Sequence, residues 1–198
     1  QRRHLRTVQQ ASRSLLGLLN DILDISKVEA GKLELESIPF EPAQIIHEIR
    51  VLFAEAARQK GLRIESEWAG ASGQPGQRYL GDPHRLCQML SNLVGNALHH
   101  GSADHPVRIA VDGTRPEEVS ITVSNGGTIP AGLLPHLFDP FRGGEREPGR
   151  HQGLGLGLFI AHQIVRAHRG AIEAKSQDNV TTFRVTLPRH APARSAVA

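Results

Sequence analysis

Two segments about 60 residues apart constrain the fold and the chemistry of this chain of 198 residues. The first, residues 92–97 (NLVGNA), places the amides of Asn92 and Asn96 four positions apart, on one face of an expected helix. The second, residues 153–158 (GLGLGL), alternates glycine with leucine and leads into a helical pattern over residues 159–168. A glycine-rich turn before a helix lets backbone N–H groups bind a phosphate, and an amide oxygen can ligate Mg²⁺. Together the segments predict a Mg-ATP site.

The glycine run differs from the common phosphate-binding loops. It lacks the Lys-Ser/Thr ending of the Walker sequence, and its G-x-G-x-G spacing is not the G-x-G-x-x-G of dinucleotide-binding loops. By itself the run is also consistent with a tight turn that allows close packing of the following helix. The order of the motifs along the chain therefore has to decide between these two interpretations.

Composition describes an ordinary globular protein, with 39% hydrophobic and 22% charged residues, and the length suits one α/β domain plus an appendage. The net charge of +3 comes from scattered basic residues, so we expect no nucleic-acid partner. No apolar run approaches 18 residues, so we expect no signal peptide and no membrane contact by this part of the protein. The single Cys87 cannot form an internal disulfide, which fits a reducing, cytoplasmic compartment.

Residues 2–30 are expected to form one long helix. Apolar side chains recur at a spacing of three to four, for example at Leu15, Leu19 and Ile22, and Gly31 is a plausible end. The apolar arc is wider than one contact would cover, which favours a dimeric helical bundle. The alternative is a helix that folds back on its own domain.

The rest of the chain mixes helices and strands without a regular βαβ repeat, which predicts an α+β two-layer α/β sandwich. The expected helices cover residues 42–60, 83–99, 131–137 and 154–168. The expected strands cover residues 33–36, 62–68, 79–80, 106–112, 118–124, 170–176 and 181–187.

Four motifs in a fixed order resemble the ATP-binding domain of sensor histidine kinases, within the gyrase–Hsp90–histidine kinase–MutL ATPase superfamily. They are residues 81–101 (GDPHRLCQMLSNLVGNALHHG), 123–141 (VSNGGTIPAGLLPHLFDPF), 153–176 (GLGLGLFIAHQIVRAHRGAIEAKS) and 181–189 (TTFRVTLPR). Residues 14–36 (SLLGLLNDILDISKVEAGKLELE) are similar to the junction of the dimerisation and ATP-binding domains in hybrid sensor kinases. The resemblance implies a Bergerat-type ATP-binding fold, with ATP and Mg²⁺ as cofactors.

The resemblance gives Asn96 the role of Mg²⁺ ligand. Asn92 stands where related ATPases carry a Glu that activates water. An amide cannot accept a proton, so Asn92 would disfavour hydrolysis and preserve ATP for transfer to a side chain. His99 stands where relatives often carry a basic residue near the phosphates, and the alternative is an exposed histidine at a helix end.

The base-binding segment departs from the family pattern. Residues 125–127, from Asn125 to Gly127, stand where the family has Asp-x-Gly, whose Asp binds the adenine amine. Asn125 can accept a hydrogen bond from that amine, but without the assistance of a charge. The stretch is one residue shorter than in many relatives, so Ser124 is the alternative. Thr181 matches a Thr of the family's last Gly-Thr segment, although Val180 replaces the Gly.

The phosphates would lie among the residues of the glycine run: Gly153, Leu154, Gly155, Leu156 and Gly157. Residues 142–152 would form a mobile lid, and Arg142, Arg146 and Arg150 are candidate phosphate contacts. Ile129 and Phe141 belong to segments that resemble those packed beneath this lid in the family, and plain core packing is an equally good interpretation.

The resemblance also implies an acceptor histidine, which residues 1–198 are expected to lack. His4 is followed by neither the Glu nor the Pro of the usual acceptor motif, and it precedes only one helix of a hairpin. We therefore expect three parts: a partial bundle helix (1–31), an ATP-binding catalytic domain (32–189) and a disordered tail (190–198).

Three functions compete at this point. The first is the catalytic portion of a sensor histidine kinase, the cytoplasmic part of a bacterial inner-membrane receptor, with a second copy and a response regulator receiver domain as partners. The second is a degenerate domain that acts as a dimerising regulatory module, which Asn125 and Val180 favour. The third is a hydrolysing ATPase, which Asn92 disfavours.

Overall fold

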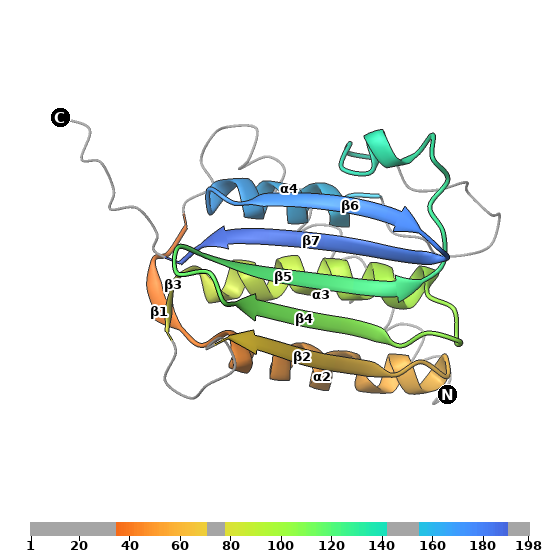
Figure 1. The fold of residues 1–198 in the computed structure, drawn as a ribbon, viewed down its shortest axis with the longest axis horizontal. Coiled ribbons are helices and arrows are strands. Elements are labelled where there is room, and N and C mark those ends of the chain that lie inside the picture. Colours follow the sequence, from red (N-terminus) through yellow and green to blue (C-terminus); the bar gives the residue numbers. More distant parts are fainter. Residues whose placement is uncertain (1–34, 71–77, 142–154, 190–198) are drawn as a thin grey trace, which may run out of the picture.

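The computed structural model describes residues 35–70, 78–141 and 155–189, and in these ranges helices cover one face of a five-stranded sheet (Figure 1). The strand order is β2-β4-β5-β7-β6; only β2 and β4 pair in parallel, and the other neighbours are antiparallel. The strands are β2 (Ile64–Gly70), β4 (Val107–Gly113), β5 (Glu118–Gly126), β6 (Ala171–Gln177) and β7 (Val180–Pro188). This two-layer arrangement confirms the predicted α+β sandwich.

Three helices form the second layer: α2 (Pro42–Gln59), α3 (Pro83–His100) and α4 (Gly157–Ala167). A separate two-stranded sheet pairs β1 (Ile38–Phe40) with β3 (Tyr79–Gly81), and a 3₁₀ turn covers Leu134–His136. The expected helices and strands of the described residues are therefore confirmed to within a few residues, with three exceptions. The helix expected over residues 131–137 is only a 3₁₀ turn of three residues. Helix α4 begins at Gly157 and not at residue 154, and the expected strand at 33–36 is wrong in its described part.

A hydrogen bond to a side chain explains why residues 35 and 36 do not form the expected strand. The backbone N–H of Glu36 donates to the carboxylate of Asp82 (3.2 Å) instead of a neighbouring strand, so strand pairing starts only at Ile38. Strand β3 is correspondingly short, because the chain after Gly81 turns into helix α3. The expected helix over residues 2–30 lies outside the described residues, as do the lid and the C-terminal tail.

Helix α3 begins as its sequence predicts. Oδ1 of Asp82 accepts the backbone N–H of Arg85 (3.0 Å), and Pro83 follows in the first turn, where its missing N–H costs nothing. Helix α2 likewise starts at a proline, Pro42, and ends just before Gly61, whose φ of 68° favours glycine.

The hydrophobic core lies between the sheet and the helices. Strands β4, β5 and β7 alternate buried and less buried side chains, as expected when one sheet face is covered. Helix α3 contributes the largest buried set, and Leu93, Val94 and Ala97 have no exposed area. The amide-bearing helix is thereby fixed in rotation by its apolar side.

A tight hairpin joins the last two strands. Asp178 and Asn179 both have positive φ, 51° and 58°, as in the two-residue turns whose twist matches antiparallel strands. The pairing that follows sets Ser176 opposite Thr181 and, across β7, Thr181 opposite Asn125. Within the described ranges, none of the helices is long and apolar enough to cross a membrane.

Candidate functional site

Asn92 of α3 lies next to the start of α4. A Cβ atom added at Gly157, the first residue of α4, would lie 3.5 Å from Cγ of Asn92, so the two helices are in close contact here. The Asn92 side-chain nitrogen is buried and has no hydrogen-bond partner among the described residues. Asn96 lies one turn further along the same helix and is also half-buried. Asn92 therefore presents an unsatisfied polar group at the junction of two helices.

The N-terminus of α4 is available to an anion. No side chain of the described residues caps it, and its N-cap residue Leu156 is buried. Gly155 has a φ of 70°, which lets the chain turn sharply into the helix. The first backbone N–H groups of a helix lack internal partners and carry the positive end of the helix dipole. Asn92 and these N–H groups together form a donor-rich corner suited to phosphate.

A second cluster lies at the end of β5. Asn125 is buried, and its Nδ2 donates to the carbonyl of Gly126 (2.8 Å). Its position is on the helix-covered face of β5, whereas the alternative residue Ser124 is on the opposite face. The structure thus directs Asn125, and not Ser124, toward the helix layer.

Thr181 holds the turn that follows Asn125. Its hydroxyl donates to the carbonyl of Gly127 (2.9 Å), and the N–H of Gly127 donates to the carbonyl of Asn179 (2.8 Å). Gly127 has a φ of 123°, and a Cβ there would lie 3.0 Å from the carbonyl oxygen of His100. This turn is therefore packed against the C-terminal end of α3 and requires glycine.

Helix α3 connects the two clusters. Asn92 contacts the start of α4, Asn96 follows one turn later, and the helix ends at His100, whose backbone meets Gly127. From residue 92 to residue 100 the helix rises by roughly 12 Å. The His99 side chain is exposed, with its ring 4.7 Å from that of His100. Helix α3 therefore runs from the donor-rich corner at Asn92 to the turn beside the buried Asn125 of β5.

The two residues expected beneath the lid, Ile129 and Phe141, differ in how far they are buried. Ile129 packs against the core, and its N–H donates to Oγ of Ser176 (2.8 Å). Phe141 is 65% exposed and has a positive φ of 62°. The packed aromatic of this segment is Phe138, whose ring lies 5.2 Å from His162 and 6.4 Å from Phe183. Gly153, Leu154 and the three arginines Arg142, Arg146 and Arg150 lie outside the described residues.

One supporting residue was missed from the sequence. Ser176 accepts the N–H of Ile129 and lies 3.4 Å from the hydroxyl of Thr181, so it joins the base of the turn to β6. The sequence contained a signal for this contact. Residue 176 ends one expected strand and residue 181 begins the next, so the predicted hairpin places them opposite each other.

Comparison with known proteins identifies the family. The family described as "Histidine kinase-, DNA gyrase B-, and HSP90-like ATPase" matches residues 81–191. The signal transduction histidine-protein kinase BarA of Escherichia coli (strain K12) is 36% identical over 184 residues, 90% of this chain. The chain corresponds to 20% of the length of BarA.

Solved structures share the fold. The catalytic domain of the histidine kinase ThkA superposes with a TM-score of 0.68 at 27% identity, covering 79% of this chain and 97% of that one. ThkA in complex with the response regulator TrrA gives 0.69 at 25% identity, over 91% and 50%. Full-length ShkA in complex with AMPPNP gives 0.76 at 25% identity, over 95% and 38%. These findings favour the kinase over the regulatory-module interpretation.

The bond from Thr181 to Gly127 can be tested by removing one hydroxyl. We expect Thr181→Val to lower the free energy of unfolding by roughly 1–3 kcal/mol, because it leaves a partly buried carbonyl without its donor. Thr128→Val is the matched control, since the Thr128 hydroxyl bonds the exposed side chain of Asn179 (3.2 Å). Urea denaturation measures both, and equal losses would show that the Thr181 bond has no special importance.

Proposed function

Since the chain belongs to the family of histidine kinase-, DNA gyrase B- and HSP90-like ATPases, as the ATP-binding catalytic portion of a sensor histidine kinase, we propose that it transfers the γ-phosphoryl group of Mg-ATP to a histidine outside residues 1–198. The contact between Asn92 and Gly157 is the observation that carries this proposal. It places an unsatisfied amide beside an uncapped helix N-terminus.

Asn92 favours transfer over hydrolysis. A water molecule must lose a proton as it attacks a phosphoryl group, and a nearby carboxylate could accept that proton. The amide of Asn92 cannot accept it, although its buried nitrogen can donate to a phosphate oxygen. The chain's contribution to the reaction is then positioning and charge stabilisation, which is the usual division of labour in phosphoryl transfer.

Asn96 is the proposed Mg²⁺ ligand. An amide oxygen suits this hard cation, which takes few protein ligands and binds phosphate oxygens and water at its other positions. Asn96 lies one helical turn from Asn92 and therefore on the same side of α3. When bound, the metal would neutralise charge on the phosphates and help to orient them.

The adenine end of the site is proposed to lie at Asn125 and Gly127. The Asn125 amide nitrogen donates to Gly126, so the carbonyl oxygen is the atom left for an exocyclic amine. Guanine presents a carbonyl at the corresponding position, so this geometry favours adenine. Thr181 supports the turn from beneath, and the phosphate-binding role of the glycine run would extend from Gly157 back to Gly153.

Three further proposals concern the domain organisation, the partner and the cellular context. Residues 1–31 would pair with those of a second copy, residues 32–189 would be the catalytic domain, and residues 190–198 a tail. A response regulator receiver domain is the proposed partner, by analogy with the complex of ThkA and TrrA. A bacterial inner-membrane receptor is the proposed context, with this portion on the cytoplasmic side.

Asn96→Ala tests the metal site. We expect Mg-ATP affinity to fall by roughly 10- to 100-fold, the range seen when the shells around a bound metal are altered. ATP affinity in EDTA should change little, because the fold and the phosphate-binding helix are intact. Calorimetry with and without Mg²⁺ measures both. Unchanged Mg-ATP affinity in the variant would mean that Asn96 is not the ligand.

A labelling experiment tests the position of the acceptor. With radiolabelled ATP and Mg²⁺, we expect no acid-labile phosphate on the chain, because His4 is not the acceptor. His4→Gln should behave identically. Labelling of the chain that disappears in His4→Gln would show instead that the acceptor is present within residues 1–198.

Light scattering tests the proposed dimer. The chain of 198 residues should self-associate with increasing concentration, whereas a truncated chain beginning at Lys32 should stay monomeric. The physical reason is the apolar arc that includes Leu15, Leu19 and Ile22, which needs a partner surface. Identical masses for both chains at high concentration would contradict the pairing.

A further inference from the structure

His168 connects the far ends of α3 and α4, away from the proposed phosphate corner. Its Nδ1 lies 2.8 Å from the carbonyl oxygen of Ile164, and its Nε2 accepts the backbone N–H of Asp82 (3.1 Å). A carbonyl can only accept and a backbone N–H can only donate, so these partners fix the ring as neutral, with the hydrogen on Nδ1. The ring therefore joins the end of α4 to the first turn of α3.

Asp82 extends this connection to a third part of the chain. Its Oδ1 accepts the N–H of Arg85, and its Oδ2 accepts the N–H of Glu36. Glu36 belongs to the leading segment, Leu35–Ser37, which precedes β1. Asp82 is 6% exposed, so these bonds are shielded from water. One buried residue thus contacts the leading segment, α3 and, through His168, α4.

The two helices run antiparallel, and the other end of α4 touches the middle of α3. The start of α3 meets the end of α4 at Asp82 and His168, while Asn92 meets the first residue of α4, Gly157. The eleven residues of α4 span roughly 16 Å between these contacts. Because a helix this short moves nearly as a rigid body, a shift at the His168 end changes the placement of Gly157 against Asn92.

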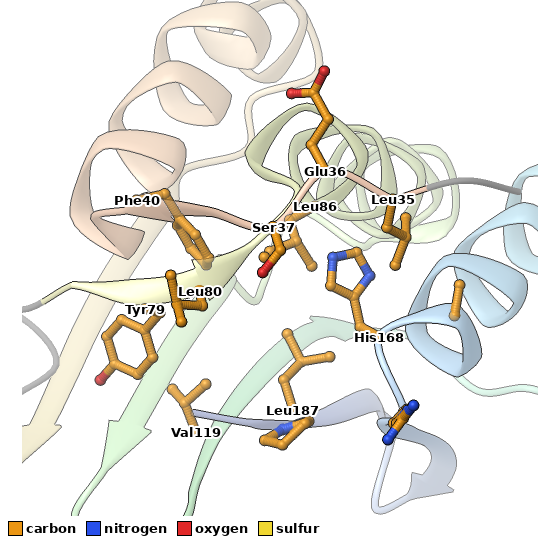
Figure 2. Close-up of a pocket in the computed structure, with 14 residues that line it drawn as sticks. Leu35, Glu36, Ser37, Phe40, Tyr79, Leu80, Leu86, Val119, His168 and Leu187 are labelled. Atoms are coloured by element: carbon orange, nitrogen blue, oxygen red, sulfur yellow. The ribbon is translucent and has the colours of Figure 1, made fainter. Parts of the chain in front are cut away.

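Packing alone does not fix the ring. His168 borders a pocket of about 200 Å³ whose walls include Leu35, Phe40, Leu86 and Leu187, and Figure 2 shows the ring pointing toward the segment that carries Glu36. The pocket leaves the ring free space on one side. The backbone of Gly81 packs against the ring, and the two hydrogen bonds hold it where it borders the pocket.

We propose that His168 is a positioning residue for the nucleotide site. His168 holds α4 against α3 through Asp82, and it transmits displacements of the leading segment to the phosphate corner. The proposal rests on the ATP site described above. It assigns to the Asp82–His168 pair the place where an N-terminal signal would reach the bound nucleotide.

The charge state of the ring supports the assignment. Burial lowers the pKa of His168 below its usual value, more than the bond to Ile164 and the Asp82 carboxylate raise it. The other titratable or charged groups around the pocket are Glu36, Tyr79 and Arg169. The neutral ring therefore predominates above about pH 6.5. As the pH falls further, protonation turns Nε2 into a donor facing the N–H of Asp82, and the bond between the helices is lost.

Two substitutions separate the two bonds of the ring. Gln places its carbonyl oxygen as far along the side chain as Nε2, so His168→Gln can keep the bond from Asp82 without titrating. Asn places its amide where Nδ1 lies, so His168→Asn can keep only the bond to Ile164. His84→Gln and His84→Asn are controls, because His84 is exposed on the first turn of α3.

We expect His168→Asn to weaken Mg-ATP binding by about two- to tenfold at pH 7.5, the effect of one neutral hydrogen bond. His168→Gln should bind like the unmodified chain, and its affinity should depend less on pH between 5.5 and 7.5. The His84 variants should leave both readouts unchanged. Calorimetry well below the unfolding temperature of each variant measures these affinities. Equal affinities for His168→Asn and His168→Gln, whether both normal or both reduced, would overturn the proposal.

A measurement without nucleotide distinguishes this inference from the proposed function. In the absence of ATP, the amide chemical shifts of Gly157 and Leu158 should differ from those of the unmodified chain in His168→Asn. In His168→Gln they should equal those of the unmodified chain. If the unmodified chain fails to bind ATP, the proposed function fails, and these shifts still decide whether His168 positions α4. Unmoved shifts in His168→Asn would overturn the inference even if ATP binds.

Discussion

Helix α3 serves two purposes at once, and the rest of the structure depends on how they are combined. One side of the helix carries seven buried apolar residues, among them Met89, Leu93 and Val94. Each such side chain contributes on the order of 1.5–3 kcal/mol when fully buried. Between these residues lie Asn92 and Asn96. The same packing that stabilises the domain therefore fixes the rotation of the helix and the direction of both amides.

The contact of α3 with α4 brings together the groups of the proposed phosphate site. A helix that starts with glycine can bring its uncapped N–H groups close to a neighbour, and Gly157 makes such an approach to Asn92. A Cβ at this position would already be in van der Waals contact with Asn92. The opposite ends of the same helices are held by hydrogen bonds through Asp82 and His168. Both ends of α4 are thus in contact with α3, with the proposed phosphate site at one end and the connection to the leading segment at the other.

The hairpin of β6 and β7 supports the other half of the site. Its two-residue turn sets the register that brings Thr181 beneath Gly127 and opposite Asn125. A slip of one residue would move Thr181 to the other face of the sheet, because side chains alternate along a strand. The adenine end of the site therefore relies on a turn that contacts no nucleotide in the proposed arrangement.

Local patterns in the sequence were sufficient to predict most of the helices and strands. The spacing of apolar residues gave α2, α3 and α4, the Asp82–Pro83 pair gave the start of α3, and the alternation along the last strands gave β6 and β7, because each of these signals acts over a few neighbouring residues. The four ordered motifs indicated the family and the positions of Asn92 and Asn96. Only the tertiary structure showed that Asn125, and not Ser124, faces the helix layer, since one position separates the two faces of β5. It alone packed Phe138 against the core and left Phe141 exposed, and it alone joined His168 to Asp82 across 86 positions. Contacts at that separation are set by how the layers pack, which no local periodicity encodes.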